Sequence, residues 1–431
     1  MSIECNEDEL VPPKWMDGAF FLKVAGIQPL KRETTKYKYK YKCNNSRVKE
    51  QIVIIKTVPE QHSAKYQQLS GLHFFANEEL IYSEVIPKFE AIWRHYGENI
   101  KFGGRALYSA LQPHPVIVLE DLCLAGYDIL RDRLFKLDEV KACLHKLACW
   151  HAVSHKVTLQ QQRAVNRTPP VSTASAECER AARAAVVSLH HGLFTATNLM
   201  NTAYMHNGLR NMIAALEQAG GLEVYLTKLR AMQPQLLERC LEMNNAYVAA
   251  GVEGPIYVLN HGDFHTRNLM VRQTADGRVE DAVFIDFQAS FLGPSGCDLQ
   301  YLSVTLFDRQ LRDEKRDELF SFYFQCFVEG LRRKLQFTGH VPSFDDFTAD
   351  CKRWRHFEIY LLTTNLPLTA LNPAKGCNVA INRIFNEKKY RSFYYRNPDY
   401  IAYLRELLPK YLTDGYLDAR FKVFLKCAYN S

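Results

Sequence analysis

The amino-acid sequence predicts a two-lobed α+β fold, with a small β-rich lobe over residues 1–121 and a larger, mainly helical lobe over residues 122–431. Patterns typical of β-strands are concentrated at the front of the chain, and helical periodicity dominates beyond Tyr127. A short strand-rich segment at 256–290 interrupts the helices. The 431 residues would suffice for roughly two or three domains, but no low-complexity linker divides them. We therefore expect one fold with two lobes.

Composition places the chain among ordinary globular proteins. The 47% hydrophobic and 23% charged residues exclude collagen-like, disordered and disulfide-scaffold classes. The net charge of +7 is too small to indicate a nucleic-acid partner, and we expect none.

Several features predict a cytoplasmic protein. The chain has no run of about 18 consecutive apolar residues, so we expect no membrane-spanning helix. Residues 1–10 are acidic and lack the apolar stretch of a secretory signal. The cysteines are scattered and form no Cys-x-x-Cys pair, which is typical of a reducing compartment. The sequence does not indicate an oligomeric state.

The smaller lobe is expected to begin with a helix and two strands. Residues 15–24 are amphipathic and predict the helix. Over residues 34–42 Lys and Tyr alternate, so a strand there places lysines on one face and tyrosines on the other. A solvated lysine face is the simpler interpretation, and lysines close to bound phosphates are the alternative. The second strand, over 51–58, carries one charged residue, Lys56, among β-branched neighbours.

A helix and a further strand complete the smaller lobe. The helix expected over 74–85 carries Glu78 and Tyr82 on one side, and Pro87 is expected to stop it. The strand over 115–122 ends at the polar pair Glu120-Asp121, where the chain crosses into the larger lobe.

Long helices are expected in the larger lobe. Apolar residues recur with helical spacing over 137–157, 181–218 and 222–249. The last two patterns fall within a segment at about 156–255, which reads as a helical insert ahead of the strand-rich segment.

The strand-rich segment carries the most informative residues. An apolar strand delivers His261-Gly-Asp263, and Asn268 follows five residues later. Asp276-Gly277 lies between two apolar runs and predicts a hairpin, whose second strand ends at Asp286. One loop and one hairpin thus bring two carboxylates and a carboxamide together.

This set of residues suits phosphoryl transfer from ATP to a hydroxyl group. Asp263 is expected to accept or orient the hydroxyl proton, while Asn268 and Asp286 supply oxygen ligands for Mg²⁺. Lys56 is the expected cation on the nucleotide phosphates, held by Glu78. The adjacent Glu79 is the alternative partner; Tyr82 lies on the side of Glu78 and favours Glu78.

The motifs together resemble those of a known family. His261-Gly-Asp263 with Asn268, a hairpin and then Asp286-Phe-Gln is similar to the catalytic and metal loops of the protein-kinase-like fold, in the branch of aminoglycoside phosphotransferases and choline kinases. The pattern is closer still to the insect ecdysteroid kinase-like family, also called CHK kinase-like. Further matching segments are 75–87, 116–121, 147–152 and 293–299.

The resemblance covers nearly the whole chain and implies a protein-kinase-like fold and an ATP- and Mg²⁺-dependent small-molecule kinase. Glu120 is then assigned to the nucleotide-binding residues, and His261 and Asp298 to structural support of the loop. Two positions depart from the pattern. The stretch 28–35, which corresponds to the glycine-rich nucleotide loop of kinases, has no glycine, and His265 stands where many members have Trp.

The acceptor is expected to be a small molecule. Gly262 replaces the Arg that protein kinases use to dock a phosphorylated activation loop, and the segment from Asp286 to Asp298 is too short for a protein substrate. The family resemblance implies a hydroxylated, lipophilic acceptor such as an ecdysteroid or a xenobiotic. The alternatives are a choline- or aminoglycoside-type acceptor, which needs carboxylates in the cleft, and a pseudokinase that binds a ligand or partner without turnover.

Overall fold

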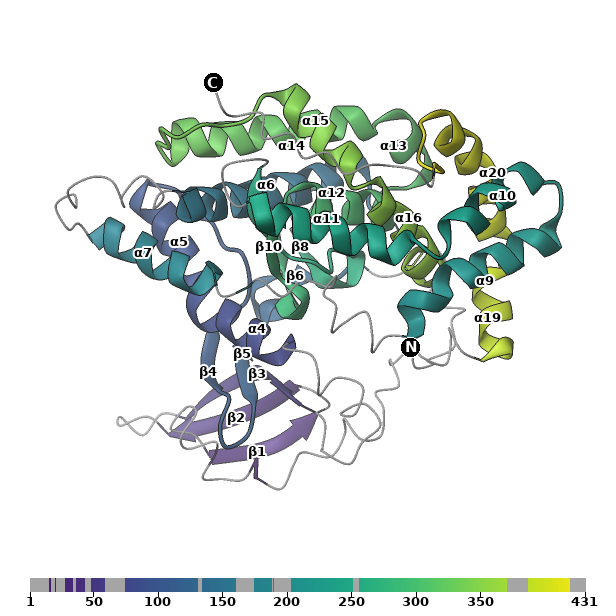
Figure 1. Ribbon diagram of the computed structural model, residues 1–431. Coiled ribbons are helices and arrows are strands. Elements are labelled where there is room, and N and C mark those ends of the chain that lie inside the picture. Colours follow the sequence, from purple (N-terminus) through teal and green to yellow (C-terminus); the bar gives the residue numbers. More distant parts are fainter. Residues whose placement is uncertain are drawn as a thin grey trace.

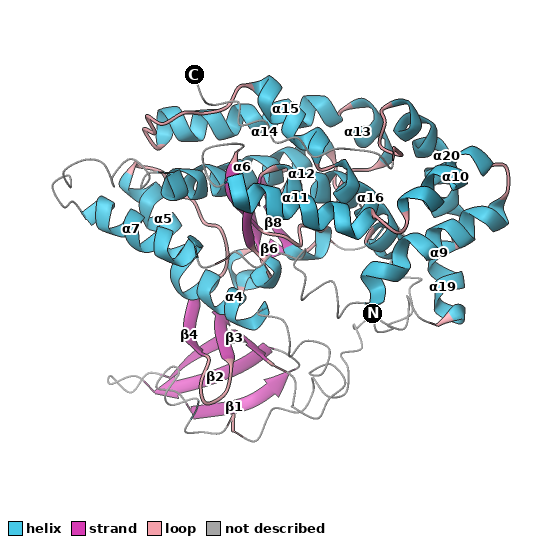
Figure 2. Cartoon of the chain, viewed as in Figure 1, coloured by secondary structure: helices cyan, strands magenta, loops and turns pink. Residues whose placement is uncertain are grey.

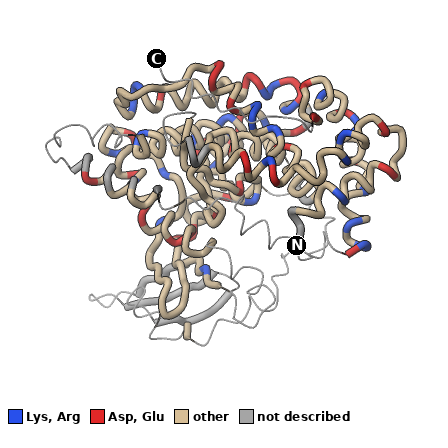
Figure 3. Tube along the Cα trace, viewed as in Figure 1, with Lys and Arg blue, Asp and Glu red and all other residues tan. Residues whose placement is uncertain are grey.

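The computed structural model describes residues 15–16, 20, 28–33, 36–42, 48–58, 74–130, 134–159, 174–187, 189, 203–250, 256–369 and 387–418. The chain has the predicted two-lobed α+β fold (Figures 1 and 2). Strands gather in one lobe, helices make up most of the other, and charges of both signs are interspersed along those helices (Figure 3). The helix expected over 15–24 lies almost wholly outside the described residues.

The smaller lobe is an antiparallel sheet with the strand order β1-β2-β3-β5-β4. Its strands are β1 (Gln28–Glu33), β2 (Lys36–Lys42), β3 (Val48–Thr57), β4 (Ala106–Ala110) and β5 (Val116–Glu120). The alternating Lys/Tyr segment forms β2, between β1 and β3. In β3, Lys56 pairs with Ile117 of β5, and its neighbour Ile55 lies in the apolar core. The glycine-free stretch forms β1, while Thr34 and Thr35 lie outside the described residues.

The helix after β3 does not stop at Pro87, and that prediction is wrong. Helix α4 (Phe74–Leu80) continues through a π-helical turn, η1 (Ile81–Val85), into α5 (Ile86–His95). The Ile86 N–H bonds to the carbonyl of Ile81, five residues back. A proline cannot donate an interior helix bond, and the wide turn just before Pro87 resets the register so that Pro87 occupies the first turn of α5.

The larger lobe is built around α6 (Leu137–Leu159), which is buried along most of its length. Its other helices are α7 (Ala174–Val187), α9 (Ala203–Ala219), α10 (Glu223–Met232), α11 (Leu236–Ala250), α12 (Gly296–Thr305), α13 (Arg309–Glu314), α14 (Arg316–Glu329), η6 (Gly330–Lys334), α15 (Phe344–Arg353), α16 (Arg355–Thr364), α17 (Leu366–Thr369), α19 (Lys388–Tyr395) and α20 (Pro398–Thr413). Short helical turns are η2 (Leu122–Ala125), η4 (Thr266–Asn268) and η5 (Phe287–Ala289).

Two long helical patterns are divided in the structure. The pattern over 222–249 forms α10 and α11, with a turn at 233–235 that contains Pro234. The pattern over 181–218 contributes to α7 and α9. Among the described helices, none is long and apolar enough to cross a membrane.

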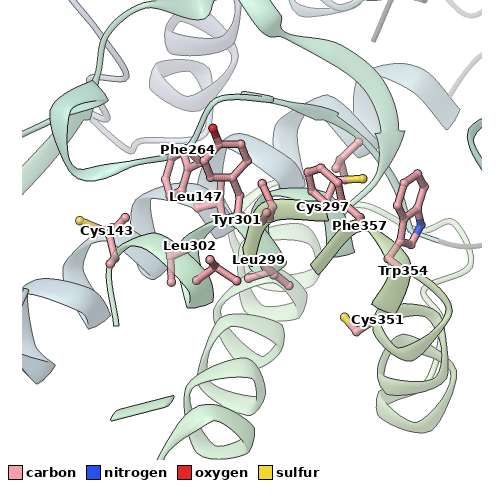
Figure 4. Close-up of a cluster of buried hydrophobic side chains, with 14 of the residues drawn as sticks. Cys143, Leu147, Phe264, Cys297, Leu299, Tyr301, Leu302, Cys351, Trp354 and Phe357 are labelled. Atoms are coloured by element: carbon pink, nitrogen blue, oxygen red, sulfur yellow. The ribbon is translucent and has the colours of Figure 1, made fainter. Parts of the chain in front are cut away.

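Two further small sheets lie within the larger lobe. The expected hairpin is present as β8 (Leu269–Gln273) and β9 (Val279–Phe284), and Gly277 in its turn has φ +81°. Strand β6 (Tyr127–Asp128) adds to β8, while β7 (Tyr257–Asn260) pairs with β10 (Phe291–Pro294). A continuous apolar core lies beneath these strands. Figure 4 shows Phe264 and Leu147 beside Tyr301 within it.

Candidate active site

The catalytic segment begins where β7 is held against α6. The Trp150 indole N–H donates to the Leu259 carbonyl at 2.7 Å, and the Ser154 hydroxyl accepts from the Leu259 N–H at 3.0 Å. Both side chains are buried on α6. The helix therefore fixes the end of the strand from which His261-Gly-Asp263 projects.

Asp298 on α12 anchors the loop that follows. Its carboxylate accepts the backbone N–H groups of His261, at 2.6 Å, and Gly262, at 2.9 Å. The His151 ring nitrogen Nε2 lies 3.2 Å from the same carboxylate, and Asp298 and His151 are both fully buried. Burial lowers the pKa of His151, so the ring is neutral and Nε2–H donates while Nδ1 accepts from the Tyr323 hydroxyl at 2.7 Å.

The His261 side chain is buried inside the loop, where a residue that supports the loop is expected. Its Nε2 lies 3.0 Å from the Ile285 carbonyl, next to Asp286, so it links the catalytic loop to the end of the hairpin. Burial lowers the pKa of His261, which keeps the ring neutral. Gly262 has φ +81°, and a Cβ there would lie 2.1 Å from the Ala289 carbonyl oxygen, so only glycine fits.

Asp263 and Asn268 lie side by side across the turn η4. The Asn268 amide nitrogen donates to the Asp263 carbonyl at 2.9 Å and to its carboxylate oxygen Oδ2 at 3.2 Å. This orientation turns the Asn268 amide oxygen away from Asp263. The backbone carbonyl of Asn268 accepts from Ile285 N–H at 3.0 Å, which places Asn268 beside the segment leading to Asp286.

Two residues that sequence reasoning missed complete the surroundings of Asp263. The Tyr301 hydroxyl donates to the carboxylate oxygen Oδ1 at 2.5 Å, and the Asn365 amide nitrogen donates to that hydroxyl oxygen. Tyr301 lies three residues after Asp298 on α12, so helical spacing from Asp298 was an available signal. Asn365 follows α16, 64 residues after Tyr301, and no local signal marks it.

His265 also contacts Asp263. Its Nε2 lies 3.5 Å from Oδ2, and its Nδ1 accepts from the Arg267 N–H at 3.2 Å. Burial alone would raise the pKa of Asp263, but the hydrogen bonds from His265 and Tyr301 outweigh it and lower the pKa to about 2. Asp263 is therefore a carboxylate at neutral pH. His265, the residue that departs from the family pattern, therefore helps to keep the candidate base Asp263 ionised.

Lys56 links the smaller lobe to Asp286. Its ammonium Nζ lies 2.5 Å from Glu78 Oε1 and 3.3 Å from Asp286 Oδ1. Burial alone would lower the pKa of Lys56. The two carboxylates together outweigh burial and raise the pKa above its ordinary value, so the ammonium remains charged. Glu79, the alternative partner, instead accepts from the Ser109 hydroxyl at 2.6 Å.

Asp286 leaves β9 in an unusual backbone conformation, with φ +67°. The Tyr82 hydroxyl accepts from its N–H at 3.4 Å, and the Tyr82 ring packs edge-on against Phe287. Tyr82 is buried on η1. The π-helical turn that accommodates Pro87 therefore also carries a side chain that holds the expected metal residue.

The donor set fits a hard cation. The Asn268 oxygen Oδ1 and the Asp286 oxygen Oδ2 receive no hydrogen bond from any described residue. Carboxylate and amide oxygens are the ligands that Mg²⁺ prefers, together with phosphate oxygens and water. Among the described residues no group of three or more His, Cys, Asp or Glu is arranged to hold a metal without such help.

Glu120 lies apart from this set of contacts. Its carboxylate accepts from the Arg105 N–H at 2.9 Å and from the Lys101 ammonium. Burial alone would raise the pKa of Glu120, but the hydrogen bonds from Lys101 and Arg105 outweigh burial and lower this pKa. The assignment of Glu120 to the nucleotide stays a prediction, and its carboxylate is already engaged at the edge of β5.

A model of the ecdysteroid kinase-like family matches residues 33–337, which is more than half of the chain and contains every residue described above except Asn365. The chain belongs to the ecdysteroid kinase-like family. Membership indicates a small-molecule phosphotransferase. No curated protein matches the chain.

Three solved structures similar to this family member are distant in sequence. A spectinomycin phosphotransferase solved with ADP and spectinomycin is 13% identical, with 92% of this chain and 97% of that chain covered and a TM-score of 0.40. A choline kinase from Cryptosporidium parvum is 12% identical, with coverages of 91% and 92% and a TM-score of 0.38. An aminoglycoside phosphotransferase from Alicyclobacillus acidocaldarius is 12% identical, with coverages of 90% and 94% and a TM-score of 0.35. Because these scores are low, the fold assignment rests on the strand order and the family match.

Proposed function

We propose that the protein is an ATP- and Mg²⁺-dependent small-molecule O-phosphotransferase of the cytoplasm. The observation that carries the proposal is one continuous set of contacts. It begins at the Glu78–Lys56 ion pair and continues from Lys56 to Asp286, at the end of the hairpin. Asn268, which directly precedes the hairpin, donates a hydrogen bond to Asp263. Residues 1–121 would act as the nucleotide lobe and 122–431 as the catalytic and substrate lobe.

In this mechanism Asp263 orients the acceptor hydroxyl and receives its hydrogen bond. The hydroxyl oxygen forms a bond to the γ-phosphorus, the bond from phosphorus to the departing ADP oxygen breaks, and the proton passes to Asp263 or to the transferred phosphate. Lys56 would neutralise the nucleotide phosphates. When bound, Mg²⁺ supplies charge neutralisation on the phosphate oxygens, and Asn268 and Asp286 are the residues that would hold it.

The surroundings of Asp263 favour a lipophilic acceptor over a cationic one. Its described side-chain partners are Asn268, Tyr301 and His265, none of which is a carboxylate. A cation such as choline would require acidic groups there. We therefore favour a hydroxylated acceptor such as an ecdysteroid or a xenobiotic.

The test is phosphate transfer from Mg·ATP to ecdysone, to a panel of hydroxylated xenobiotics, and to choline and kanamycin, followed by mass spectrometry of each acceptor. We expect phosphorylation of lipophilic acceptors only, and its loss in Asp263→Asn. Transfer only to choline or kanamycin would contradict the acceptor class. Tight Mg·ATP binding without transfer to any acceptor would instead favour a pseudokinase.

A further inference from the structure

A cavity of about 280 Å³ lies where α12, α13, α17 and α20 meet, close to the candidate active site. Figure 1 shows α13 and α20 at the same end of the larger lobe. The cavity, called here the Arg312 cavity, has mainly apolar walls from Val304, Phe307, Leu366, Tyr400 and Tyr403, and one cation, Arg312. Its volume is near the lower limit of small-molecule sites.

Arg312 is buried, and no described residue supplies it with a counter-ion. Only 6% of the residue is exposed, its Nε has no acceptor, and its guanidinium makes no hydrogen bond or ion pair with any described residue. The guanidinium lies over the Tyr403 ring, 4.0 Å from its centroid, and the enclosed Tyr403 hydroxyl also lacks a partner. Asp399 and Glu406 line the exposed rim of the cavity, but neither carboxylate forms an ion pair with Arg312.

A second, half-buried arginine nearby shows how the fold treats such a group when its role is structural. Arg316 binds both carboxylate oxygens of Glu358, at 2.9 and 2.7 Å, and the Tyr411 hydroxyl donates to the same carboxylate. A buried charge without such a partner is costly. The described residues thus provide a carboxylate partner for Arg316 and none for Arg312, although the two arginines lie four residues apart.

One residue of the cavity wall is hydrogen-bonded to the candidate catalytic loop. Thr305, in the cavity wall, donates its hydroxyl hydrogen to the carbonyls of Phe264, at 3.1 Å, and Tyr301, at 2.8 Å. Thr305 lies one helical turn, about 6 Å, along α12 from Tyr301, whose hydroxyl binds Asp263. Leu366 directly follows Asn365, the other member of that hydrogen-bond chain.

We propose that the Arg312 cavity binds the anionic end of the phosphoryl acceptor. The acceptor is then an amphipathic molecule whose hydroxyl group lies at Asp263 and whose carboxylate or sulfate group binds Arg312. This inference rests on the proposed function and narrows its substrate class. A planar guanidinium forms paired hydrogen bonds with such groups, and the apolar walls cover the body of the ligand.

The test compares anionic probes with neutral counterparts. Calorimetry without nucleotide measures the binding of ω-hydroxydodecanoate and its methyl ester, and of estradiol sulfate and estradiol. At least one anion is expected to bind about ten- to a hundredfold more tightly than its neutral counterpart, the usual effect of one charge-assisted hydrogen-bonded pair. The pair in which the anion binds more tightly than its neutral counterpart shows whether the site recognises a carboxylate or a sulfate.

Variants separate a ligand site from a structural role. Arg312→Met is expected to abolish the preference for the anion while the melting temperature stays level or rises, because an unpaired buried charge is removed. Arg333→Met, which removes an exposed positive charge, is the control and should keep the preference. Equal binding of anions and neutral probes, no binding of either, or a preference that survives in Arg312→Met would overturn the proposal.

Failure of this inference differs from failure of the proposed function. Mg·ATP binding and transfer to a neutral steroid with no anion preference would overturn the Arg312 site alone. Arg312-dependent binding of a probe that is never phosphorylated, together with no transfer to any other acceptor, would overturn the kinase function and with it the acceptor role of the cavity.

Discussion

At the scale of single residues, the site depends on two carboxylates with different partners. Asp263 accepts hydrogen bonds from the Asn268 amide and the Tyr301 hydroxyl and lies beside His265, whereas Asp286 lies beside the Lys56 ammonium. Asp263 is therefore suited to accept a hydrogen bond from a hydroxyl group, and Asp286 is suited to bind a cation that also contacts the nucleotide phosphates. The next two predictions test these assignments.

Asp286→Asn is expected to abolish the Mg²⁺ dependence of ATP binding, because an amide replaces the only carboxylate among the expected metal ligands. The far-ultraviolet spectrum should be unchanged, since Asp286 is half-buried at the end of a strand. Calorimetric titration of ATP with and without Mg²⁺ measures the effect. Asp263→Asn is the control, which should bind Mg·ATP normally while kcat falls roughly 10²- to 10⁴-fold. Unchanged Mg·ATP affinity in Asp286→Asn would contradict the metal assignment.

The pKa of Asp263, lowered to about 2, makes a prediction about pH. The carboxylate is ionised above about pH 4, so Asp263 should cause no loss of kcat/KM between pH 5 and 8, as a profile over that range can show. Because the folded-state pKa is depressed, its stabilising contribution is complete above about pH 4 and is lost as the pH falls toward 2. Tyr301→Phe removes a donor and should move the acid limb to higher pH; an unmoved limb would mean that another group controls it.

At the scale of elements, helix α4 and turn η1 decide which acidic residue reaches Lys56. Glu78 and Tyr82 lie on the side that faces Lys56 and Asp286, while Glu79 reaches Ser109 on β4. Glu78→Gln should weaken Mg·ATP binding or turnover about tenfold or more, because Lys56 loses a charged partner. Glu79→Gln is the matched control and should change both by less than about twofold. Equal losses in the two variants would argue against a specific role for Glu78.

Helix α12 holds the catalytic loop through one buried carboxylate. Asp298→Asn replaces an acceptor of two backbone N–H groups and one imidazole N–H with an amide whose own N–H₂ faces those donors. The free energy of unfolding should fall by about 2–4 kcal/mol, as urea denaturation can measure. Asp276→Asn, in the exposed hairpin turn, should change it by less than about 0.5 kcal/mol. A change that small at Asp298 would refute its anchoring role.

At the scale of the whole molecule, the proposed nucleotide site would be divided between the two lobes, which meet at Lys56 and Asp286. A second link lies behind it, where the Lys146 ammonium binds the Lys101 carbonyl at 2.8 Å and Asp281 at 2.7 Å. The Phe284 N–H also donates to the Phe102 carbonyl at 2.8 Å, which joins β9 to the segment leading into β4. A ligand that contacts both lobes should therefore stabilise the entire fold.

Mg·ATP at about a hundred times its dissociation constant should stabilise the folded protein by about 2.7 kcal/mol, because only the folded state binds it. Differential scanning calorimetry should show one transition that moves to higher temperature. In Lys56→Met the shift at the same concentration should be much smaller. A transition of one lobe that moves alone would contradict a shared site.

The sequence by itself determined the two-lobed class and the hairpin, because these depend on local patterns: strand alternation and an Asp-Gly turn. Short motif spacing predicted the residues of the candidate catalytic loop, and their catalytic role stays a prediction. It also indicated Glu78 over Glu79 through helical spacing, and that ion pair is present. The continuation of the helix past Pro87 was missed, because the compensating π-helical turn leaves no local pattern.

Only the tertiary structure decided which distant groups surround these residues. Tyr301 reaches Asp263, and Asn365 reaches Tyr301, because α12 and the end of α16 pack together, whereas Arg312 receives no counter-ion from the described residues. Such contacts depend on how helices far apart in the chain pack. A sequence pattern specifies the buried face of a helix, but the partner that covers that face is chosen by the packing of the whole molecule.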